Sequence, residues 1–170
     1  MFQIRTAIID DIPALRKLAA MSFENTYLDT IAPHYLAPYI ALHFSLERLT
    51  AEFTDVKNTF FLACQDDELI GYLKLREGKV PDCIADKNCL EIERIYADPD
   101  QKGRGIGSAL IAAAADEAKA RDRTSIWLGV FQKNTPAVGF YQAKGFAIAG
   151  HAIFVMGDEE QDDYVMVKKV

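Results

Sequence analysis

The sequence predicts an α/β (α+β) fold, a mixed central sheet of about seven strands with helices on both faces. Apolar runs rich in β-branched residues alternate with stretches of helical periodicity. Their order is strand, two helices, three strands, helix, strand, helix, two strands. The two strand–helix–strand stretches imply parallel crossovers, whereas strands joined by short turns imply antiparallel hairpins. The length of 170 residues is typical of one domain, and half of the residues are apolar, which is enough for a full core. We therefore expect a single domain over residues 1–170.

The first third of the chain carries one expected strand and two expected helices. Residues 2–9 ("FQIRTAII") alternate like a strand, and the aspartate pair that follows can cap a helix over 10–25. Residues 27–39 hold two prolines and several aromatic rings, so we expect an irregular loop with at most short helices. Residues 44–53 ("FSLERLTAEF") have the pattern of a short amphipathic helix.

The rest of the chain carries two more helices and most of the strands. One helix follows a glycine-rich loop and reaches residue 121, and another covers 134–145, with Gly145 at its C′ position. A longer loop is expected over 78–88. Strands are expected over 59–65, 68–77, 89–98, 125–132, 146–156 and 163–170.

Composition excludes several classes of protein. The net charge of −6 argues against a nucleic-acid partner. The three cysteines, Cys64, Cys83 and Cys89, are widely spaced and odd in number, so neither a disulfide framework nor a metal cluster is expected. The longest apolar run, "ALIAAAA", is far shorter than the roughly 20 residues that cross a bilayer. We therefore expect a cytoplasmic monomer or homodimer that binds no metal, membrane or nucleic acid.

The glycine-rich loop in "DPDQKGRGIGSALIAAAADEAK" is the strongest functional motif. A strand, a glycine turn and a helix N-terminus form an anion site, because free backbone N–H groups and the helix dipole point the same way. A Walker loop would need a lysine after the last glycine, and a Rossmann fingerprint would need a G-x-G-x-x-G spacing. A purely structural turn is the remaining alternative. Lys102 and Arg104 interleave with Gly103, Gly105 and Gly107, which favours a pyrophosphate ligand.

Two motifs resemble those of the GNAT superfamily of N-acetyltransferases, which uses acetyl-CoA. They are "YADPDQKGRGIGSAL" and "NTPAVGFYQAKGF". The pieces "LEIERIY", "IWLGV" and "MGDEEQDDYVM" are similar to PaiA-type spermine/spermidine acetyltransferases. The chain departs from these families at Lys102, where glutamine or arginine is usual, and at Asp162, where relatives often have threonine. The PaiA-type loop also lacks the Gly103–Arg104 pair. The resemblance implies a GNAT-like sheet and acetyl-CoA as co-substrate.

The resemblance also implies which residues contact the cofactor. The strand end at 95–97 matches the segment whose backbone pairs with pantetheine amides in relatives. Asn134 can cap its helix and, by resemblance, also contact the pantetheine or pyrophosphate arm. The expected cofactor-binding residues are Ile95, Tyr96, Ala97, Lys102, Gly103, Arg104, Gly105, Ile106, Gly107, Ser108, Asn134, Ala137 and Tyr141.

Acetyl transfer to an amine raises two proton problems. An alkylamine with a pKa of ~10.4 must lose a proton before it attacks. Glu91 and Glu93 alternate on one strand, so they face the same side and are the candidate bases; pairing with Arg94 or a lysine is the alternative. The departing thiolate must be stabilised, and Tyr141 matches a family tyrosine that hydrogen-bonds the CoA sulfur. Its role as proton donor, as hydrogen-bond donor, or as a packed aromatic beside Phe140 stays open.

The acceptor side is expected near Glu24 and Tyr27, which lie in the region that walls the acceptor in the family. Asp158 belongs to the acidic run "GDEEQDDY", interpreted either as a rim that attracts cations or as a solvated hairpin turn. We expect an N-acetyltransferase that acts on a small-molecule primary amine, foremost a polyamine. The alternatives are acetylation of a protein lysine or N-terminus, and a non-catalytic acyl-CoA-binding module.

Overall fold

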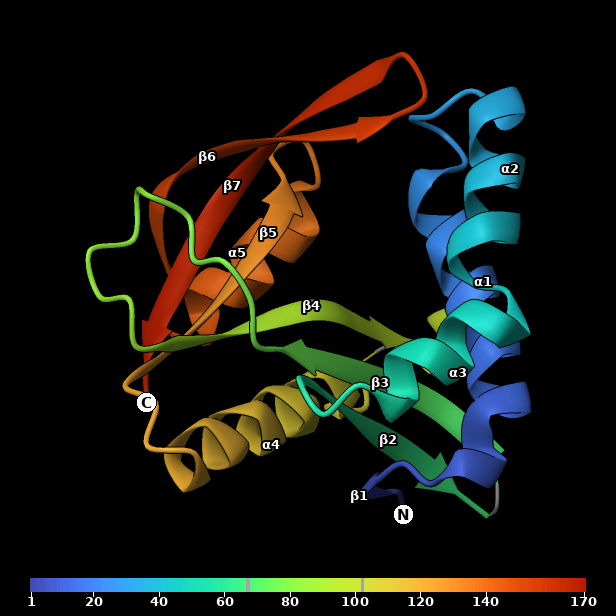
Figure 1. The fold of residues 1–170 in the computed structure, drawn as a ribbon, viewed down its shortest axis with the longest axis horizontal. Coiled ribbons are helices and arrows are strands. Elements are labelled where there is room, and N and C mark those ends of the chain that lie inside the picture. The colour runs from blue at the N-terminus through green and yellow to red at the C-terminus, as the bar shows by residue number, and fades with distance from the viewer. Residues whose placement is uncertain (67, 102) are drawn as a thin grey trace. The chain divides into compact units, whose positions relative to one another are not determined.

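The computed structural model describes residues 1–66, 68–101 and 103–170 (Figure 1). The strands are β1 (Gln3–Thr6), β2 (Asn58–Gln65), β3 (Glu68–Arg76), β4 (Cys89–Ala97), β5 (Ser125–Phe131), β6 (Ala147–Met156) and β7 (Glu159–Lys169). The helices are α1 (Ile12–Tyr27), α2 (Pro33–His43), α3 (Leu46–Thr54), α4 (Ile106–Ala120) and α5 (Thr135–Ala143), with short 3₁₀ turns at Ile9–Asp11 and Pro99–Gln101.

The strands form one mixed sheet, as the sequence predicts. Their order is β1-β2-β3-β4-β5-β7-β6. β4 and β5 are parallel, whereas β1–β2, β5–β7 and β6–β7 are antiparallel. The register of β4 with β5 runs from Cys89–Ser125 to Glu91–Trp127, although β4 continues to Ala97. The register of β5 with β7, in contrast, extends to the last residue of β5, where Phe131 faces Asp163.

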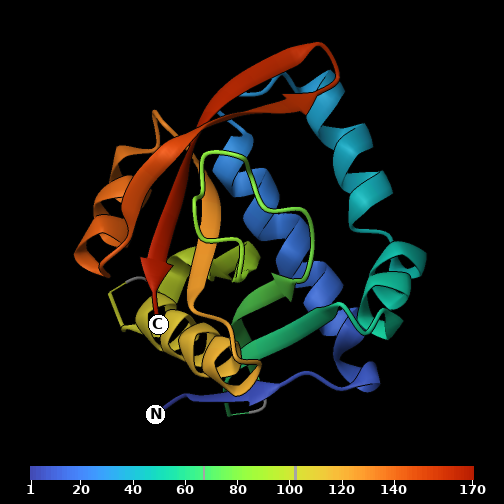
Figure 2. The same ribbon diagram turned by 60° about the vertical axis from the view of Figure 1, so that its left-hand side comes forward.

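The chain divides into two compact units, and the first comprises residues 1–74 and 94–110. In it, α1, α2 and α3 pack side by side (Figures 1 and 2). Gly71 and Lys74 are three residues apart on β3, so they point to opposite faces. A Cβ at Gly71 would lie 2.8 Å from a methyl group of Ile106 on α4, and Lys74 pairs with Glu52 on α3. Helices therefore cover both faces of this part of the sheet.

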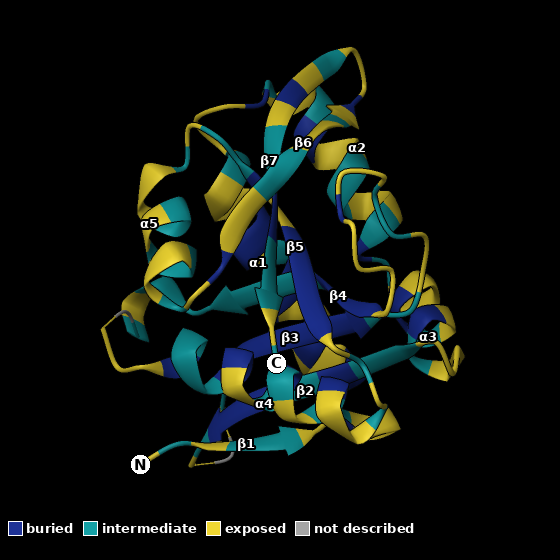
Figure 3. Cartoon of the chain, turned by 90° about the vertical axis from the view of Figure 1, so that its left-hand side faces the viewer, coloured by how far each residue is buried: buried dark blue, intermediate teal, exposed yellow. Residues whose placement is uncertain are grey.

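The second unit comprises residues 75–93 and 111–170. Most residues of β5 are buried, and Figure 3 shows this strand largely in dark blue. Ile126, Leu128 and Met166 are buried on one face. Trp127 and Val165 belong to a separate buried cluster on the opposite face. This unit thus presents two differently lined faces.

The expected loop at 27–39 is wrong, because Pro33–His43 form helix α2. Pro33 occupies the first helical turn, where the missing N–H would have no intrahelical partner. Pro38 lies inside the helix, where proline is ordinarily unfavourable. The ring of Tyr39 stacks on Phe23 of α1 with 5.1 Å between centroids, and such tertiary packing overrides the local preference.

Two element ends also differ from the expectation. Helix α1 begins only at Ile12, and the Asp11 carboxylate accepts hydrogen bonds from Arg5 and from the backbone N–H of Ile8 instead of capping α1. Strand β7 begins at Glu159, so most of the acidic run expected as a turn is strand. Its tip is Gly157, with a φ of 62°, and the exposed Asp158.

Candidate active site

Two of the three loop glycines have backbone angles that residues with a side chain rarely adopt. Gly103 and Gly105 have φ angles of 80° and 82°, in the left-handed region that favours glycine. Both are exposed, and apart from their chain neighbours no described residue has an atom within 4 Å of a Cβ built at either position. Gly107 lies in the first turn of α4, which begins directly after the loop: the carbonyl of Gly105 accepts the N–H of Ala109 at 3.0 Å. Lys102 lies outside the described residues.

Close packing fixes the start of α4 against the strands. The Cβ position of Gly71 is 2.8 Å from Ile106 and 3.1 Å from the carbonyl oxygen of Tyr96, so no side chain fits there. The N–H of Asp98 donates to the carbonyl of Ile70 at 2.9 Å, which ties the loop entrance to β3. The N–H groups of the first helical turn, including Gly107 and Ser108, have no intrahelical acceptor by helix geometry. They and the helix dipole favour an anion at this end.

Arg104 adds a positive charge to the loop. Its guanidinium donates hydrogen bonds to the side-chain oxygens of Gln101 and Gln65. Both partners are neutral amides, so they orient the guanidinium without cancelling its charge. The loop therefore combines two open left-handed glycines, free helix N–H groups and an oriented cation.

The end of β4 carries the other residues expected beside the cofactor. Ile95, Tyr96 and Ala97 are partly buried, and the Tyr96 ring stacks on Tyr72 with 5.8 Å between centroids. The β4–β5 register stops at Glu91, well before these residues. Backbone pairing with an extended ligand such as pantetheine needs a strand end of this kind.

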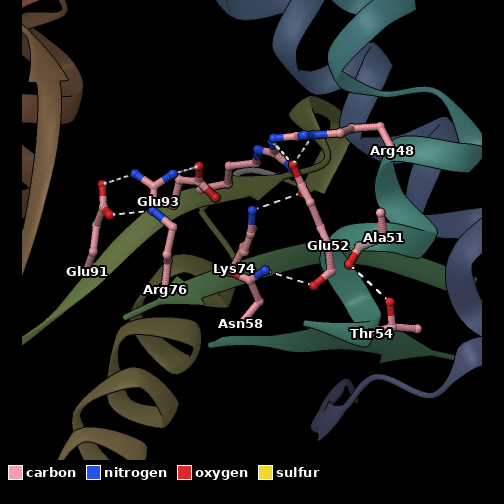
Figure 4. Close-up of polar contacts among 10 residues, drawn as sticks. Arg48, Ala51, Glu52, Thr54, Asn58, Lys74, Arg76, Glu91 and Glu93 are labelled. Atoms are coloured by element: carbon pink, nitrogen blue, oxygen red, sulfur yellow. Dashed lines mark hydrogen bonds and ion pairs between the residues drawn. The ribbon is translucent and has the colours of Figure 1, made fainter. Parts of the chain in front are cut away.

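Glu91 and Glu93 face the same side of β4, as their spacing predicts (Figure 4). Arg76 joins them: its guanidinium donates to Glu91 at 2.8 and 3.1 Å and to Glu93 at 2.6 Å. The alternative of ion pairing therefore occurs, with Arg76 of β3 as the partner of both glutamates.

Arg94 belongs to a different cluster, centred on Glu52. Figure 4 labels Glu52 with two other members of this cluster, Lys74 and Arg48. Glu52 is 6% exposed and accepts from Lys74 at 2.9 Å, from Arg94 at 2.8 and 3.1 Å, and from Arg48 at 3.0 Å. Burial alone would raise the pKa of Glu52, but the charge and hydrogen bonds of Arg94, with those of Lys74, hold it below its ordinary value. Sequence reasoning missed this cluster, although a lysine inside the apolar strand "ELIGYLKLRE" was a signal for a buried partner.

Helix α5 and its N-cap residue carry three of the expected cofactor-binding residues, Asn134, Ala137 and Tyr141. The Asn134 side chain accepts the N–H of Ala137 at 3.3 Å, so it caps the helix. The Tyr141 ring lies edge-on to Phe140 and Phe146, with centroid distances of 5.4 and 5.7 Å. Burial raises the pKa of Tyr141 to about 12. The phenol is therefore a protonated hydrogen-bond donor at neutral pH.

The residues expected on the acceptor side lie in different elements. Glu24 is exposed on α1, and the ring of Tyr27 contacts Phe23, with 4.5 Å between centroids. Asp158 lies at the exposed tip between β6 and β7. No helix in residues 1–66, 68–101 and 103–170 is long and apolar enough to span a membrane. In the same residues no cluster of three or more His, Cys, Asp or Glu side chains is placed to hold a metal ion.

Comparison with known proteins matches the Acetyltransferase (GNAT) family to residues 14–146. An uncharacterised N-acetyltransferase of Mycobacterium tuberculosis is 32% identical over 94% of this chain and 98% of its own length. The spermidine N(1)-acetyltransferase of Thermoplasma acidophilum is 27% identical over 98% of this chain and 96% of its own. The crystal structure of the PaiA N-acetyltransferase from the same organism, in complex with coenzyme A, superposes with a TM-score of 0.81 at 25% identity, covering 100% and 99% of the two chains.

Proposed function

The chain belongs to the GNAT family of acetyltransferases, and we propose that it transfers the acetyl group of acetyl-CoA to a primary amine of a polyamine such as spermidine or spermine. The observation that carries the polyamine is the similarity, over 98% of the chain, to the spermidine N(1)-acetyltransferase of T. acidophilum. The net charge of −6 and the exposed acidic tip between β6 and β7 agree with a polycationic acceptor.

The loop before α4 fits the pyrophosphate of acetyl-CoA. Gly103 and Gly105 leave open space where a Cβ would stand, so a phosphate can approach the backbone N–H groups. Arg104 supplies a charged donor. The backbone at 95–97 would hold the pantetheine arm, and Asn134 and Ala137 remain expected contacts of the cofactor by their resemblance to the family motif.

Bound acetyl-CoA supplies a thioester whose carbonyl carbon the amine attacks. Tyr141 would then stabilise the sulfur as negative charge develops. With a phenol pKa of about 12 against ~8.5 for a thiol, full proton transfer would cost about 5 kcal/mol, so Tyr141 acts as a hydrogen-bond donor. Glu91 and Glu93 would contribute negative charge that favours the approach of an ammonium group.

The test is release of CoA with spermidine, with a lysine peptide and with no acceptor. We expect rapid release with spermidine and slow release in the other two reactions. Release with the peptide alone would identify a protein acetyltransferase. Tight binding of acetyl-CoA without release in any reaction would identify a binding module and contradict the proposal.

A further inference from the structure

Strand β7 presents two polar side chains on one face of the second unit. Gln161 and Asp163 are two residues apart, so they point to the same side. Asp163 stands between Phe131 of β5 and Ala152 of β6, and Gln161 stands opposite Phe154 of β6. The register that aligns Glu91 with Trp127, and Trp127 with Val167, places Glu91 on the same face as Asp163.

Neither side chain has all of its polar atoms paired within the described residues. Gln161 is 5% exposed, and in this part of the chain its buried amide nitrogen and amide oxygen have no hydrogen-bond partner. Among the same residues the buried Oδ1 atom of Asp163 has no partner either. Leaving a buried polar group unpaired costs about 1–3 kcal/mol, so such groups are rare, and a catalytic or binding role is one explanation for them.

Gly129 leaves an approach to Asp163. It is exposed, although Leu128 and Val130 beside it in β5 are buried. Among residues 1–66, 68–101 and 103–170, apart from its chain neighbours, the one atom within 4 Å of a Cβ built at Gly129 is Oδ2 of Asp163, at 3.5 Å. Any side chain here would stand over the carboxylate, whereas glycine leaves it open to a small group from solvent.

The charge environment of Asp163 differs from that of the two β4 glutamates. Arg76 pairs with Glu91 and Glu93, whereas Asp163 faces Phe131, Gly129 and Ala152, none of which titrates. Burial, together with the negative charge of Asp162 next to it on β7, raises the pKa of Asp163 to about 6. A general base works best when its pKa lies near the operating pH.

We propose that the ammonium group of the acceptor binds over Gly129 against Asp163 and Gln161, and that Asp163 accepts its proton. This inference rests on the proposed amine acetylation. One N–H bond of the ammonium breaks and an O–H bond forms on Asp163, so a cation and an anion become a neutral amine and a neutral acid. The freed lone pair on nitrogen is then the nucleophile, while the Gln161 oxygen accepts a second ammonium proton as a hydrogen bond.

The test compares the pH dependence of kcat/KM in Asp163→Asn and Asp162→Asn. The second variant removes the same charge one residue away, on the opposite face of β7. In the wild type we expect an acid limb with an apparent pKa of about 6. Asp163→Asn should lose roughly 10²–10⁴-fold at pH 7 and lose this limb. Its remaining rate should rise about tenfold per pH unit towards the amine pKa of ~10.4, because only neutral amine then reacts.

The control variant should keep its rate at pH 8 within about twofold, and its acid limb should move to lower pH because Asp162 no longer raises the pKa of Asp163. An Asp163→Asn enzyme with an unchanged profile would overturn the assignment while leaving the proposed function standing. A wild type that acetylates no amine would contradict both.

Gly129→Ala provides a second variant that keeps every polar group. Its methyl group would stand 3.5 Å from Asp163 Oδ2, a distance that the fold tolerates. We expect KM for the amine to rise at least about fivefold, with little change in acetyl-CoA affinity. An unchanged KM would show that the ammonium does not approach over Gly129.

Discussion

The carboxylates of this protein differ in what surrounds them, and their chemistry follows from that. Glu52, Glu91 and Glu93 each form an ion pair with a guanidinium. Asp163 has no charged cross-strand neighbour in the β5 and β6 register, and burial, together with the negative charge of Asp162, raises its pKa to about 6. The residue type is therefore less informative than the local environment.

The raised pKa of Asp163 predicts a pH-dependent cost in stability. The unfolded carboxyl ionises near 3.8 and the folded one near 6, so this contribution favours the fold below pH 4 and is lost as pH rises through 6. Asp163→Asn should be more stable than the wild type at pH 8, by about 1–2 kcal/mol after allowance for solvent screening. At pH 4 the difference should shrink strongly. Urea unfolding at both pH values measures it, and a variant less stable at pH 8 would show a structural role instead.

Tyr141 is the residue whose loss should affect the chemical step most selectively. Tyr141→Phe keeps the ring packing against Phe140 and Phe146 and removes only the hydroxyl. Because the hydroxyl acts as charge develops on sulfur, we expect single-turnover rates to fall about 10²–10³-fold with little change in acetyl-CoA affinity. Wild-type rates in the variant would remove Tyr141 from the mechanism.

At the scale of elements, the buried carboxylate of Glu52 links helix α3 to the sheet. Glu52→Gln would leave Lys74 and Arg94 without that charge, and both are largely buried, at 2% and 12% exposure. We expect a loss of about 3–5 kcal/mol in the free energy of unfolding. The matched control is Arg48→Ala, which removes a partner that is 55% exposed and should cost at most about 1 kcal/mol. Equal losses in the two variants would contradict a buried anchor.

The loop before α4 predicts a specific effect on acetyl-CoA binding. Gly105→Glu would block the backbone N–H groups and bring a negative charge to the pyrophosphate, so calorimetry should detect no binding. Gly105→Ala is the control for backbone strain, since a φ of 82° costs any side chain roughly 1–2 kcal/mol. We expect the alanine variant to bind more weakly than wild type but measurably. Unchanged affinity in a folded Gly105→Glu protein would mean that the loop holds something else.

Local sequence patterns predicted the elements where the pattern and the packing agree. The strands and helices α3, α4 and α5 have regular periodicity, and Gly145 ends α5 with a φ of 87°, as a C′ glycine should. Helix α2 was missed because Pro33 and Pro38 argue locally against a helix. Packing against α1, which acts over a distance in sequence, decides its conformation.

At the scale of the whole molecule, the sequence predicted the class of fold and the cofactor, but it did not predict which polar side chains pair with one another. Glu91 and Glu93 form ion pairs with Arg76, which lies on β3 and at least 15 residues away in sequence, so the residues around the two glutamates do not identify it. Whether Gln161 and the Oδ1 atom of Asp163 find hydrogen-bond partners depends on the side chains that face them from β5 and β6, and no local motif encodes those neighbours. Contacts between residues on neighbouring strands depend on the order and register of the strands. Hydrophobic periodicity predicts the strands themselves but not their register.

The acidic balance of the molecule predicts how acceptor preference responds to salt. The net charge is −6, and Asp158 and Glu160 are exposed at the β6–β7 tip. Each further ammonium about 4 Å from a carboxylate gains roughly 1 kcal/mol in water and ~4 kcal/mol near a protein surface, before desolvation is subtracted. Exposed charges are screened beyond ~10 Å at 0.1 M salt, so this gain should fall as ionic strength rises.

The most direct test of a polyamine acceptor is kcat/KM for spermidine and for butylamine at low and at high ionic strength. Both offer a primary amine on a four-carbon chain, and only spermidine carries further ammonium groups. We expect spermidine to be preferred at least about fivefold at low salt, which corresponds to roughly 1 kcal/mol, with the preference shrinking at high salt. Equal kcat/KM values for the two amines at low salt would contradict the polyamine assignment.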